Sequence, residues 1–142
     1  MPPHKILLSV LKSAPLVFWS ILIFYLSSQP TRSLSEDVSQ NVLIFKTIHI
    51  VVYAVMFTLA YLASYQYKIN KALLLAALYT LLFAVSDEIH QLFVPTRTGK
   101  VSDIFIDTLG LVIGYYTIRV MNKLNKIKKY QSIDIKNIFK PR

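Results

Sequence analysis

Residues 72–94 read ALLLAALYTLLFAVSDEIHQLFV, a long apolar run that carries Asp87, Glu88 and His90 near its end. A helix of about 20 predominantly apolar residues crosses the hydrocarbon core of a bilayer. This run meets that length, and three further apolar runs lie at residues 6–28, 42–65 and 103–121. The chain is therefore predicted to be an all-α, four-transmembrane-helix bundle.

The composition favours a membrane protein over a soluble domain. Of the 142 residues, 54% are hydrophobic and 16% are charged, whereas soluble domains average about 25% charged residues. The absence of cysteine excludes disulfide scaffolds, zinc–thiolate sites, iron–sulfur clusters and thiol nucleophiles. The length allows one domain. We assign residues 1–121 to the membrane domain and residues 122–142 to a basic cytoplasmic tail.

The positive charge is concentrated at one end of the chain and predicts its orientation. The formal net charge is +9, and residues 119–142 carry eight Lys and Arg against one acid. Cytoplasmic loops of membrane proteins are enriched in Lys and Arg. The same side of the membrane is predicted for two further basic pairs, Lys5 and Lys12 near the N-terminus and Lys68 and Lys71 between two apolar runs. We therefore expect both termini in the cytoplasm. No base-reading motif accompanies the charge, so nucleic acid is not an expected partner.

Charged side chains inside the predicted spans carry the functional signal. Each one costs roughly 2.5–3.5 kcal/mol near the bilayer centre on insertion scales, so a purely structural bundle has no need of them. Helical spacing groups them on one face of each of three helices, and a rise of about 1.5 Å per residue places them all in the outer half of the membrane. The residues expected to form this outward-facing polar pocket are Lys46, His49, Tyr53, Asp87, Glu88, His90, Gln91, Arg97, Asp103 and Asp107.

Several uses of this pocket stay open from the residues alone. The cations and anions could neutralise one another and only fix the helix register. Asp87 could act as a general base oriented by His90, with Arg97 and Lys46 holding a phosphate. The acids and histidines could also carry protons or ions. The donor types suit a divalent metal, but no His-Glu-x-x-His pattern is present, so no metal site is predicted and the cofactor is left unknown.

A stripe of small residues continues from the acids along the fourth run. Asp103, Asp107, Gly110 and Gly114 share one helical face, which ends in a Gly-x-x-x-Gly packing motif. Such a motif lets two helices approach closely. It is a candidate interface for a homodimer.

Four short segments form a combined pattern along the chain. They are Trp19 with Phe24-Tyr25-Leu26-Ser27-Ser28-Gln29-Pro30, Lys46-x-x-His49-x-x-x-Tyr53, Ser86-Asp87-Glu88-Ile89-His90-Gln91-x-Phe93-Val94-Pro95-x-Arg97 and Asp103-x-x-x-Asp107-Thr108-Leu109-Gly110-x-x-x-Gly114. In this order, over residues 16–118, the pattern resembles the VanZ-like family of bacterial membrane proteins. The third segment is the specific one. The family often has Gly where this chain has Thr96, and commonly Asn or Asp where it has Asp107.

The resemblance implies a multi-pass protein of the bacterial cytoplasmic membrane with a role in the cell envelope. The family's namesake is linked to resistance to the glycopeptide teicoplanin, so antibiotic resistance is one form that this role takes, and no reaction is defined for the family. We expect the pocket to bind or process an anionic envelope lipid or a lipid-linked precursor, with Asp87, Glu88 and His90 in the catalytic roles if a reaction occurs. Two alternatives are a proton-coupled transporter subunit and a non-catalytic partner of a cell-wall synthesis enzyme.

Overall fold

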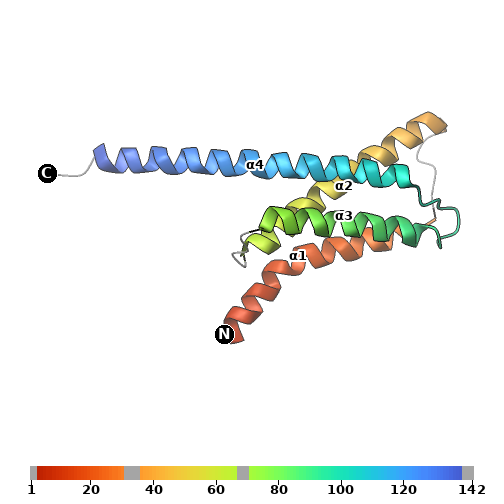
Figure 1. The fold of residues 1–142 in the computed structure, drawn as a ribbon, viewed down its shortest axis with the longest axis horizontal. Helices are drawn as coiled ribbons and strands as arrows, with labels where there is room; N and C mark the ends of the chain where they lie inside the picture. The colour runs from red at the N-terminus through yellow and green to blue at the C-terminus, as the bar shows by residue number, and fades with distance from the viewer. Residues whose placement is uncertain (1–2, 31–35, 67–70, 139–142) are drawn as a thin grey trace.

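The computed structural model describes residues 3–30, 36–66 and 71–138, and the side chains of residues 13–30, 36–65 and 71–125. Within these ranges the chain has no strand, which confirms the predicted all-α class. The helices are α1 (Pro3–Ser27), α2 (Val38–Gln66), α3 (Ala72–Gln91) and α4 (Val101–Ile138). They alternate in direction, so the start of α1 and the end of α4 lie on the side away from the α3–α4 connection (Figure 1).

The second helix is the centre of the bundle. It contacts each of the other three helices, whereas α1 contacts only α2 and α3. The apolar core lies between α2, α3 and α4 and consists of Phe57, Ala60, Tyr61, Ala72, Ala76 and Ile118. The three alanines among them let the helix backbones approach one another closely.

The Gly-x-x-x-Gly stripe of α4 packs inside the chain. A Cβ atom on Gly110 would meet the backbone carbonyl of Ile50, and one on Gly114 would lie 2.8 Å from the carbonyl oxygen of Ala54. Both glycines are buried against α2. The stripe is therefore used between α2 and α4 within the chain, and a homodimer stays a prediction.

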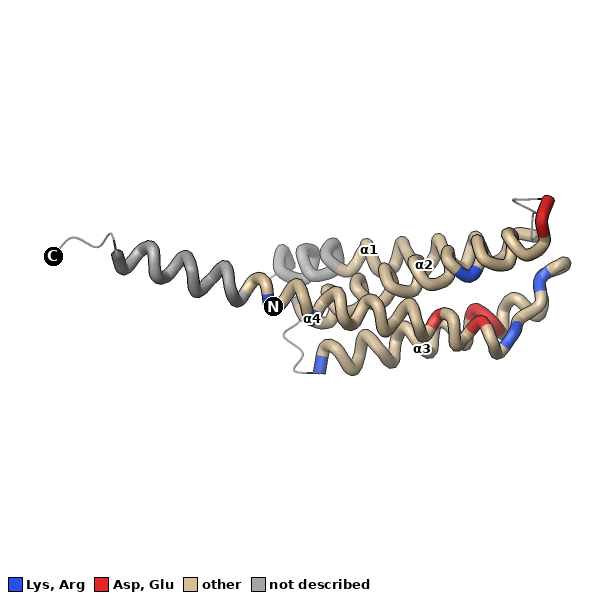
Figure 2. The backbone as a smooth tube through the Cα atoms, turned by 90° about the horizontal axis from the view of Figure 1, so that it is seen from above, with Lys and Arg blue, Asp and Glu red and all other residues tan. Residues whose placement is uncertain are grey.

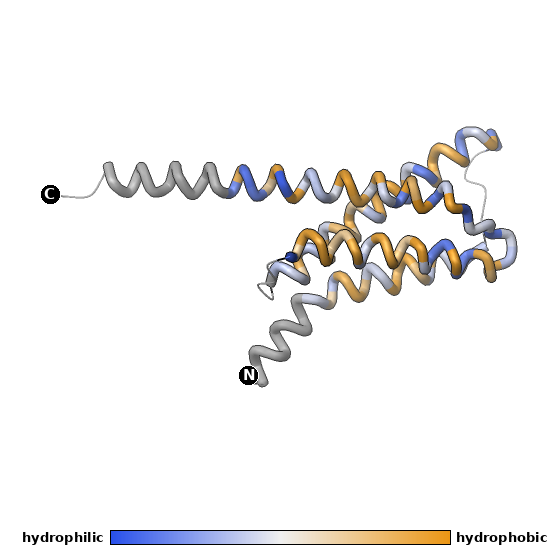
Figure 3. The backbone as a smooth tube through the Cα atoms, viewed as in Figure 1, coloured by the Kyte–Doolittle hydropathy of each residue, from blue (hydrophilic) through white to orange (hydrophobic). Residues whose placement is uncertain are grey.

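Three helices are long and apolar enough to cross a membrane. These spans are Val38–Tyr65, Ala72–Gln91 and Val101–Asn125, and they form the long hydrophobic segments of Figure 3. In α1 the apolar part with described side chains is shorter, at Ser13–Ser27. Large apolar side chains face outward, such as Phe93 at 80% exposed and Phe105 at 69%. An outward apolar surface is what a lipid solvent requires. A four-span arrangement and cytoplasmic termini stay predictions.

The helix boundaries differ from the predicted ones by a few residues at α1 and α2, and more consequentially at the end of α3 and in α4. α3 ends at Gln91 and is followed by a turn, rather than continuing to residue 94. Pro95 lacks a backbone N–H and cannot continue a helix, and Thr96 has a φ of 68°. α4 runs without a break past residue 121, where the tail was predicted to begin, to Ile138. Figure 1 shows this helix extending beyond the bundle as a single rod.

Candidate functional site

The acidic residues gather in one half of the bundle. Among the residues whose side chains are described, they lie toward the α3–α4 connection, away from the start of α1 and the end of α4 (Figure 2). Asp87, Glu88 and Asp107 are buried, at 2%, 4% and 1% exposed. Buried acids beneath an apolar outer surface mark a functional site in a membrane protein.

Asp87 links α3 to the end of α1. Its Oδ1 atom accepts a hydrogen bond of 2.6 Å from the Ser27 hydroxyl. Its Oδ2 atom accepts one of 2.9 Å from the side-chain amide of Gln91, one turn further along α3. Both carboxylate oxygens therefore already have a donor within the protein.

Glu88 links α3 to the loop that follows it. Its Oε2 atom accepts a hydrogen bond of 2.8 Å from the backbone N–H of Lys100. Its Oε1 atom is buried and has no hydrogen-bond partner among the described residues. The loop at residues 92–100 therefore folds back over the end of α3, and one carboxylate oxygen stays available beneath it.

His49 and Asp107 connect α2 to α4. The Nδ1 atom of His49 lies 2.8 Å from Oδ1 of Asp107. The other oxygen of Asp107 and the hydroxyl of Tyr53, which lies one turn beyond His49, are buried without a hydrogen-bond partner in the described part of the chain. Together with Oε1 of Glu88, three buried polar atoms in this region therefore have no hydrogen-bond partner among the described residues.

Arg97 holds the end of α1. Its Nε atom donates to the carbonyl of Gln29 at 3.0 Å, and Nη2 donates to the carbonyl of Leu26 at 3.2 Å. The last carbonyls of a helix have no partner within the helix and attract a cation. This side chain therefore has a structural role in addition to any ligand contact.

His90 lies apart from Asp87. Its ring stacks on Phe24 with the centroids 4.1 Å apart, and its Nε2 atom lies 2.9 Å from the hydroxyl of Ser28. Phe24 belongs to α1, and Ser28 directly follows this helix. The structure therefore does not bring Asp87 and His90 together as a base and its orienting partner.

The cations do not neutralise the buried acids by direct contact. Among the described side chains, the pair of His49 and Asp107 is the only ion pair within 4.0 Å. Lys46 is exposed, and Arg97 uses its hydrogen bonds on backbone carbonyls. Charge pairing alone therefore does not account for this cluster.

A family comparison matches the segment that contains every one of these contacts. The family model described as VanZ/LLP1 matches residues 13–122 of the chain. The chain belongs to the VanZ/LLP1 family. The resemblance inferred from the sequence is thereby confirmed. No curated protein and no solved structure matches the chain.

Two cavities adjoin the cluster in this VanZ/LLP1 chain. One, the polar cavity, has a volume of about 250 Å³ and is lined mainly by polar and charged side chains, which include Lys46, His49, Gln91, Thr96, Arg97, Thr98, Lys100 and Asp103. The other, the apolar cavity, has a volume of about 280 Å³ and is lined mainly by α1 and α2, through Trp19, Leu22, Ile23, Leu26, Phe45, Ile48 and Val52, with Asp87 and Tyr53 also on its wall. Both cavities are lined by Phe45, His49, Gln91 and Arg97.

Several lining residues were not among the predicted site residues. Lys100 lines the polar cavity. Trp19 lines the apolar cavity and donates from its indole N–H to the carbonyl of Val52 at 3.1 Å. A second basic residue beyond Pro95 and the one tryptophan of the chain were the signals that the sequence offered.

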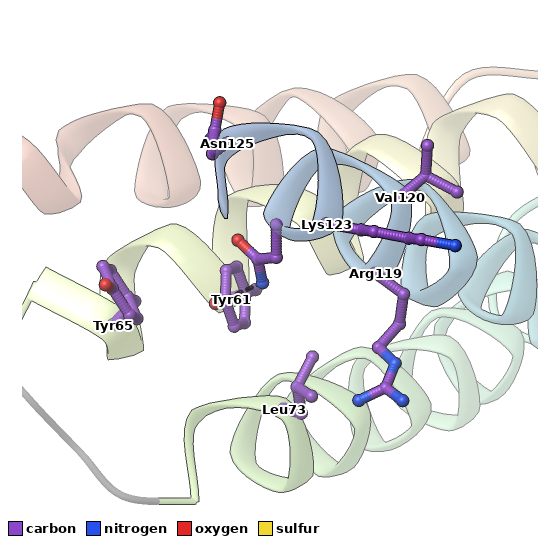
Figure 4. Close-up of a pocket in the computed structure, with 8 residues that line it drawn as sticks. Tyr61, Tyr65, Leu73, Arg119, Val120, Lys123 and Asn125 are labelled. Atoms are coloured by element: carbon purple, nitrogen blue, oxygen red, sulfur yellow. Dashed lines mark hydrogen bonds between the residues drawn. The ribbon is translucent and has the colours of Figure 1, made fainter. Parts of the chain in front are cut away.

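A larger hollow lies at the other end of the bundle, near the α2–α3 connection. It has a volume of about 800 Å³, and Arg119 and Lys123 are among its lining residues. Figure 4 shows Arg119 of α4 extending toward Leu73 of α3. Asn122 donates to the hydroxyl of Tyr61 at 3.2 Å. None of the predicted site residues lines this hollow, so it is separate from the acidic cluster.

Proposed function

We propose that the protein binds an anionic envelope lipid or lipid-linked precursor, with the headgroup in the polar cavity and the hydrocarbon chain in the apolar cavity. The observation that carries this proposal is the shared wall between the two cavities at Phe45, His49, Gln91 and Arg97. An amphiphile needs a polar and an apolar compartment side by side. Binding pockets of this kind are mostly apolar with a few placed polar groups.

The charge of the polar cavity supports an anionic headgroup. Lys46, Arg97 and Lys100 line it, against the single carboxylate of Asp103. Lys and Arg near a membrane surface each contribute about 1 kcal/mol to the attraction of an anionic lipid. Arg97 already donates hydrogen bonds to backbone carbonyls at the end of α1. We therefore assign the attraction of the anionic headgroup mainly to Lys46 and Lys100.

The contacts support binding more than catalysis. A general base must reach the proton that it removes. Both oxygens of Asp87 have donors within the protein, and His90 is not among the residues that line either cavity. Among the three expected catalytic residues, Glu88 alone has a carboxylate oxygen without a partner in the described part of the chain.

The Lys and Arg distribution supports an opening toward the outer face of the bacterial cytoplasmic membrane. A ligand that enters from this face comes from the outer leaflet of the cytoplasmic membrane. A link to teicoplanin resistance is part of this proposal. Expression in a susceptible host, with teicoplanin susceptibility measured for the wild type and for Lys46→Gln, tests that link. A resistance gain that is the same in both would contradict a role for the pocket.

The binding experiment uses the purified chain in nanodiscs and native mass spectrometry. The probes are a polyprenyl phosphate, phosphatidylglycerol and phosphatidylcholine. We expect the two phosphate-bearing anionic probes to be retained over phosphatidylcholine, and the double variant Lys46→Gln with Lys100→Gln to weaken retention by about tenfold or more, because about 1 kcal/mol per cation is lost. Lys71→Gln removes an exposed cation at the opposite end of α3 and is the matched control. An equal loss in this control would refute the assignment.

A substitution in the apolar cavity separates the two compartments. Leu22→Trp fills part of this cavity. We expect this substitution to weaken the binding of the polyprenyl phosphate and to leave the binding of inorganic phosphate unchanged. If the binding of both probes weakens, the hydrocarbon chain of the ligand does not lie in the apolar cavity.

Proton-coupled transport is a second candidate. The pair of His49 and Asp107 and the unpartnered oxygen of Glu88 provide groups that can exchange protons beside the cavities. This function predicts a pH-dependent flux in reconstituted vesicles, which lipid binding alone does not require.

A further inference from the structure

Three side chains from three helices converge at one point behind the cavities. His49 of α2, Glu88 of α3 and Asp107 of α4 each offer a ligand atom, and these atoms all lie within 4.8 Å of one another. Nitrogen of His and oxygen of Asp or Glu are the ligands that Zn²⁺ accepts when no Cys is available. The sequence predicted that these residues share one pocket, but it did not show which of the pocket's donors meet at one point, because each helix contributes only one ligand.

The cluster contains buried oxygens that nothing in the described structure satisfies. Oε1 of Glu88 and Oδ2 of Asp107 have no hydrogen-bond partner there, although both side chains are more than nine-tenths buried. The hydroxyl of Tyr53 is a third such atom. A buried polar group without a partner costs about 1–3 kcal/mol, and more when it is charged. A bound cation would satisfy both carboxylates at once.

The charge of the cluster also favours a bound cation. Two ionised carboxylates carry a charge of −2, which a protonated imidazole of His49 would reduce to −1, and no Lys or Arg lies within 4.0 Å of them among the described side chains. An uncompensated buried charge is strongly unfavourable. A divalent cation removes this imbalance without adding any side chain.

We propose that His49, Glu88 and Asp107 bind a divalent transition-metal ion, of which Zn²⁺ fits the donor set best. Ligand atoms about 2.0–2.2 Å from a tetrahedral ion lie roughly 3.3–3.6 Å from one another, so ligand atoms that lie within 4.8 Å of one another would have to move by up to about 1.5 Å to hold the ion. Three protein ligands leave one coordination position open. His49 lines both cavities, so the site adjoins them. The site does not depend on lipid binding.

The test measures metal binding in the absence of lipid and phosphate. The full chain, purified in detergent and stripped with a chelator, is dialysed against Zn²⁺ alone and its bound metal is counted. We expect one ion per chain, and a loss of affinity of more than tenfold in Glu88→Gln and in Asp107→Asn. His90→Gln removes a histidine outside the cluster and is the matched control, which should bind as the wild type does. Absence of bound Zn²⁺ in the wild type, or an equal loss in the control, would overturn the proposal.

Two further measurements keep the result interpretable if a carboxylate variant fails to fold. His49→Asn keeps both acids, and we expect Zn²⁺ to raise the thermal midpoint of the wild type and to leave that of this variant unchanged. Mg²⁺ prefers an all-oxygen shell, so it should bind much more weakly than Zn²⁺. Equal binding of the two ions would refute an imidazole ligand. Because no lipid is present, failure of this site leaves the lipid-binding result standing, and the reverse also holds.

Discussion

The backbone carbonyl of Glu88 occupies the place where a Cβ atom on Gly99 would lie. The same glutamate accepts a hydrogen bond from the backbone N–H of Lys100, the residue that follows Gly99. A glycine is required here because the loop and the end of α3 are in contact through their backbones. This contact holds the loop over the acidic cluster and sets the position of Lys100 in the polar cavity.

Gly99→Ala should destabilise the protein by about 1–3 kcal/mol, which is the usual cost of an added methyl group that forces a backbone shift. The measurement is the free energy of unfolding in detergent. Thr98→Ala removes side-chain atoms from the exposed neighbouring position and is the control, with an expected change below about 0.5 kcal/mol. If the two variants are equally stable, the backbone contact is not as close as described.

Thr96 is held in a left-handed backbone conformation, with a φ of 68°. Non-glycine residues lose roughly 1–2 kcal/mol in this region, and β-branched residues are particularly disfavoured there. Thr96→Gly should therefore stabilise the protein by about 1 kcal/mol, measured as a rise in the thermal midpoint. Thr96→Val keeps the branch and should give no gain. A gain with Val, or none with Gly, would exclude backbone strain as the cause.

Arg97 should contribute to stability as well as to ligand binding. Arg97→Gln removes the two charged donors to Leu26 and Gln29, and we expect a loss of about 1–2 kcal/mol, because the donors are partly exposed. Lys100→Gln removes a cation from the same cavity and should change the free energy of unfolding by less than about 0.5 kcal/mol. Equal stability of Arg97→Gln and the wild type would show that the contacts to α1 contribute nothing.

Much of the fold could be predicted from the sequence because a helix that crosses a lipid bilayer must be apolar over a minimum length. Apolar runs of sufficient length predicted the helices, and helical spacing predicted that His49, Glu88 and Asp107 face the interior. Spacing shows which residues share a face, but it does not show which neighbour that face meets. His90 lies three residues after Asp87, yet it packs on Phe24 of α1 while Asp87 reaches Ser27. For the same reason the partner of Gly110 and Gly114 proved to be α2.

The loop at residues 92–100 was the part least accessible to prediction. Its course depends on Pro95, on the φ of Thr96 and on the contact of Gly99 with α3. These are tertiary features, and the helical periodicity of the sequence does not predict them. The contacts of Arg97 with α1 and the place of Lys100 in the polar cavity both follow from this course.

Asp37 should make the start of α2 sensitive to acid. Its Oδ1 atom accepts hydrogen bonds from the hydroxyl of Ser39 at 2.6 Å and from the backbone N–H of Ser39 at 2.8 Å. These bonds hold the pKa of Asp37 below its ordinary value of 3.8. Because the folded pKa is depressed, the stabilisation is fully present above about pH 4 and is lost as the pH falls through the folded pKa.

Amide exchange at Ser39, followed while the pH is lowered, measures this effect. We expect protection to fall on acidification in the wild type. It should be reduced at all pH values, without that acid-dependent step, in Asp37→Asn. Glu36→Gln removes the adjacent carboxylate without touching the bonds to Ser39 and should keep the wild-type profile. An acid-dependent step that survives in Asp37→Asn would assign the effect to another group.

The orientation can be tested directly because the chain has no cysteine. Thr98 lies in the α3–α4 connection and Lys71 at the start of α3, at opposite ends of one helix, and both are exposed. If the Lys and Arg bias sets the topology, a membrane-impermeant maleimide should label Thr98→Cys in intact cells and Lys71→Cys only after permeabilisation. The cysteine-free wild type is the control for background labelling. The reverse pattern would place the polar cavity on the cytoplasmic side, and the ligand would then have to come from the inner leaflet.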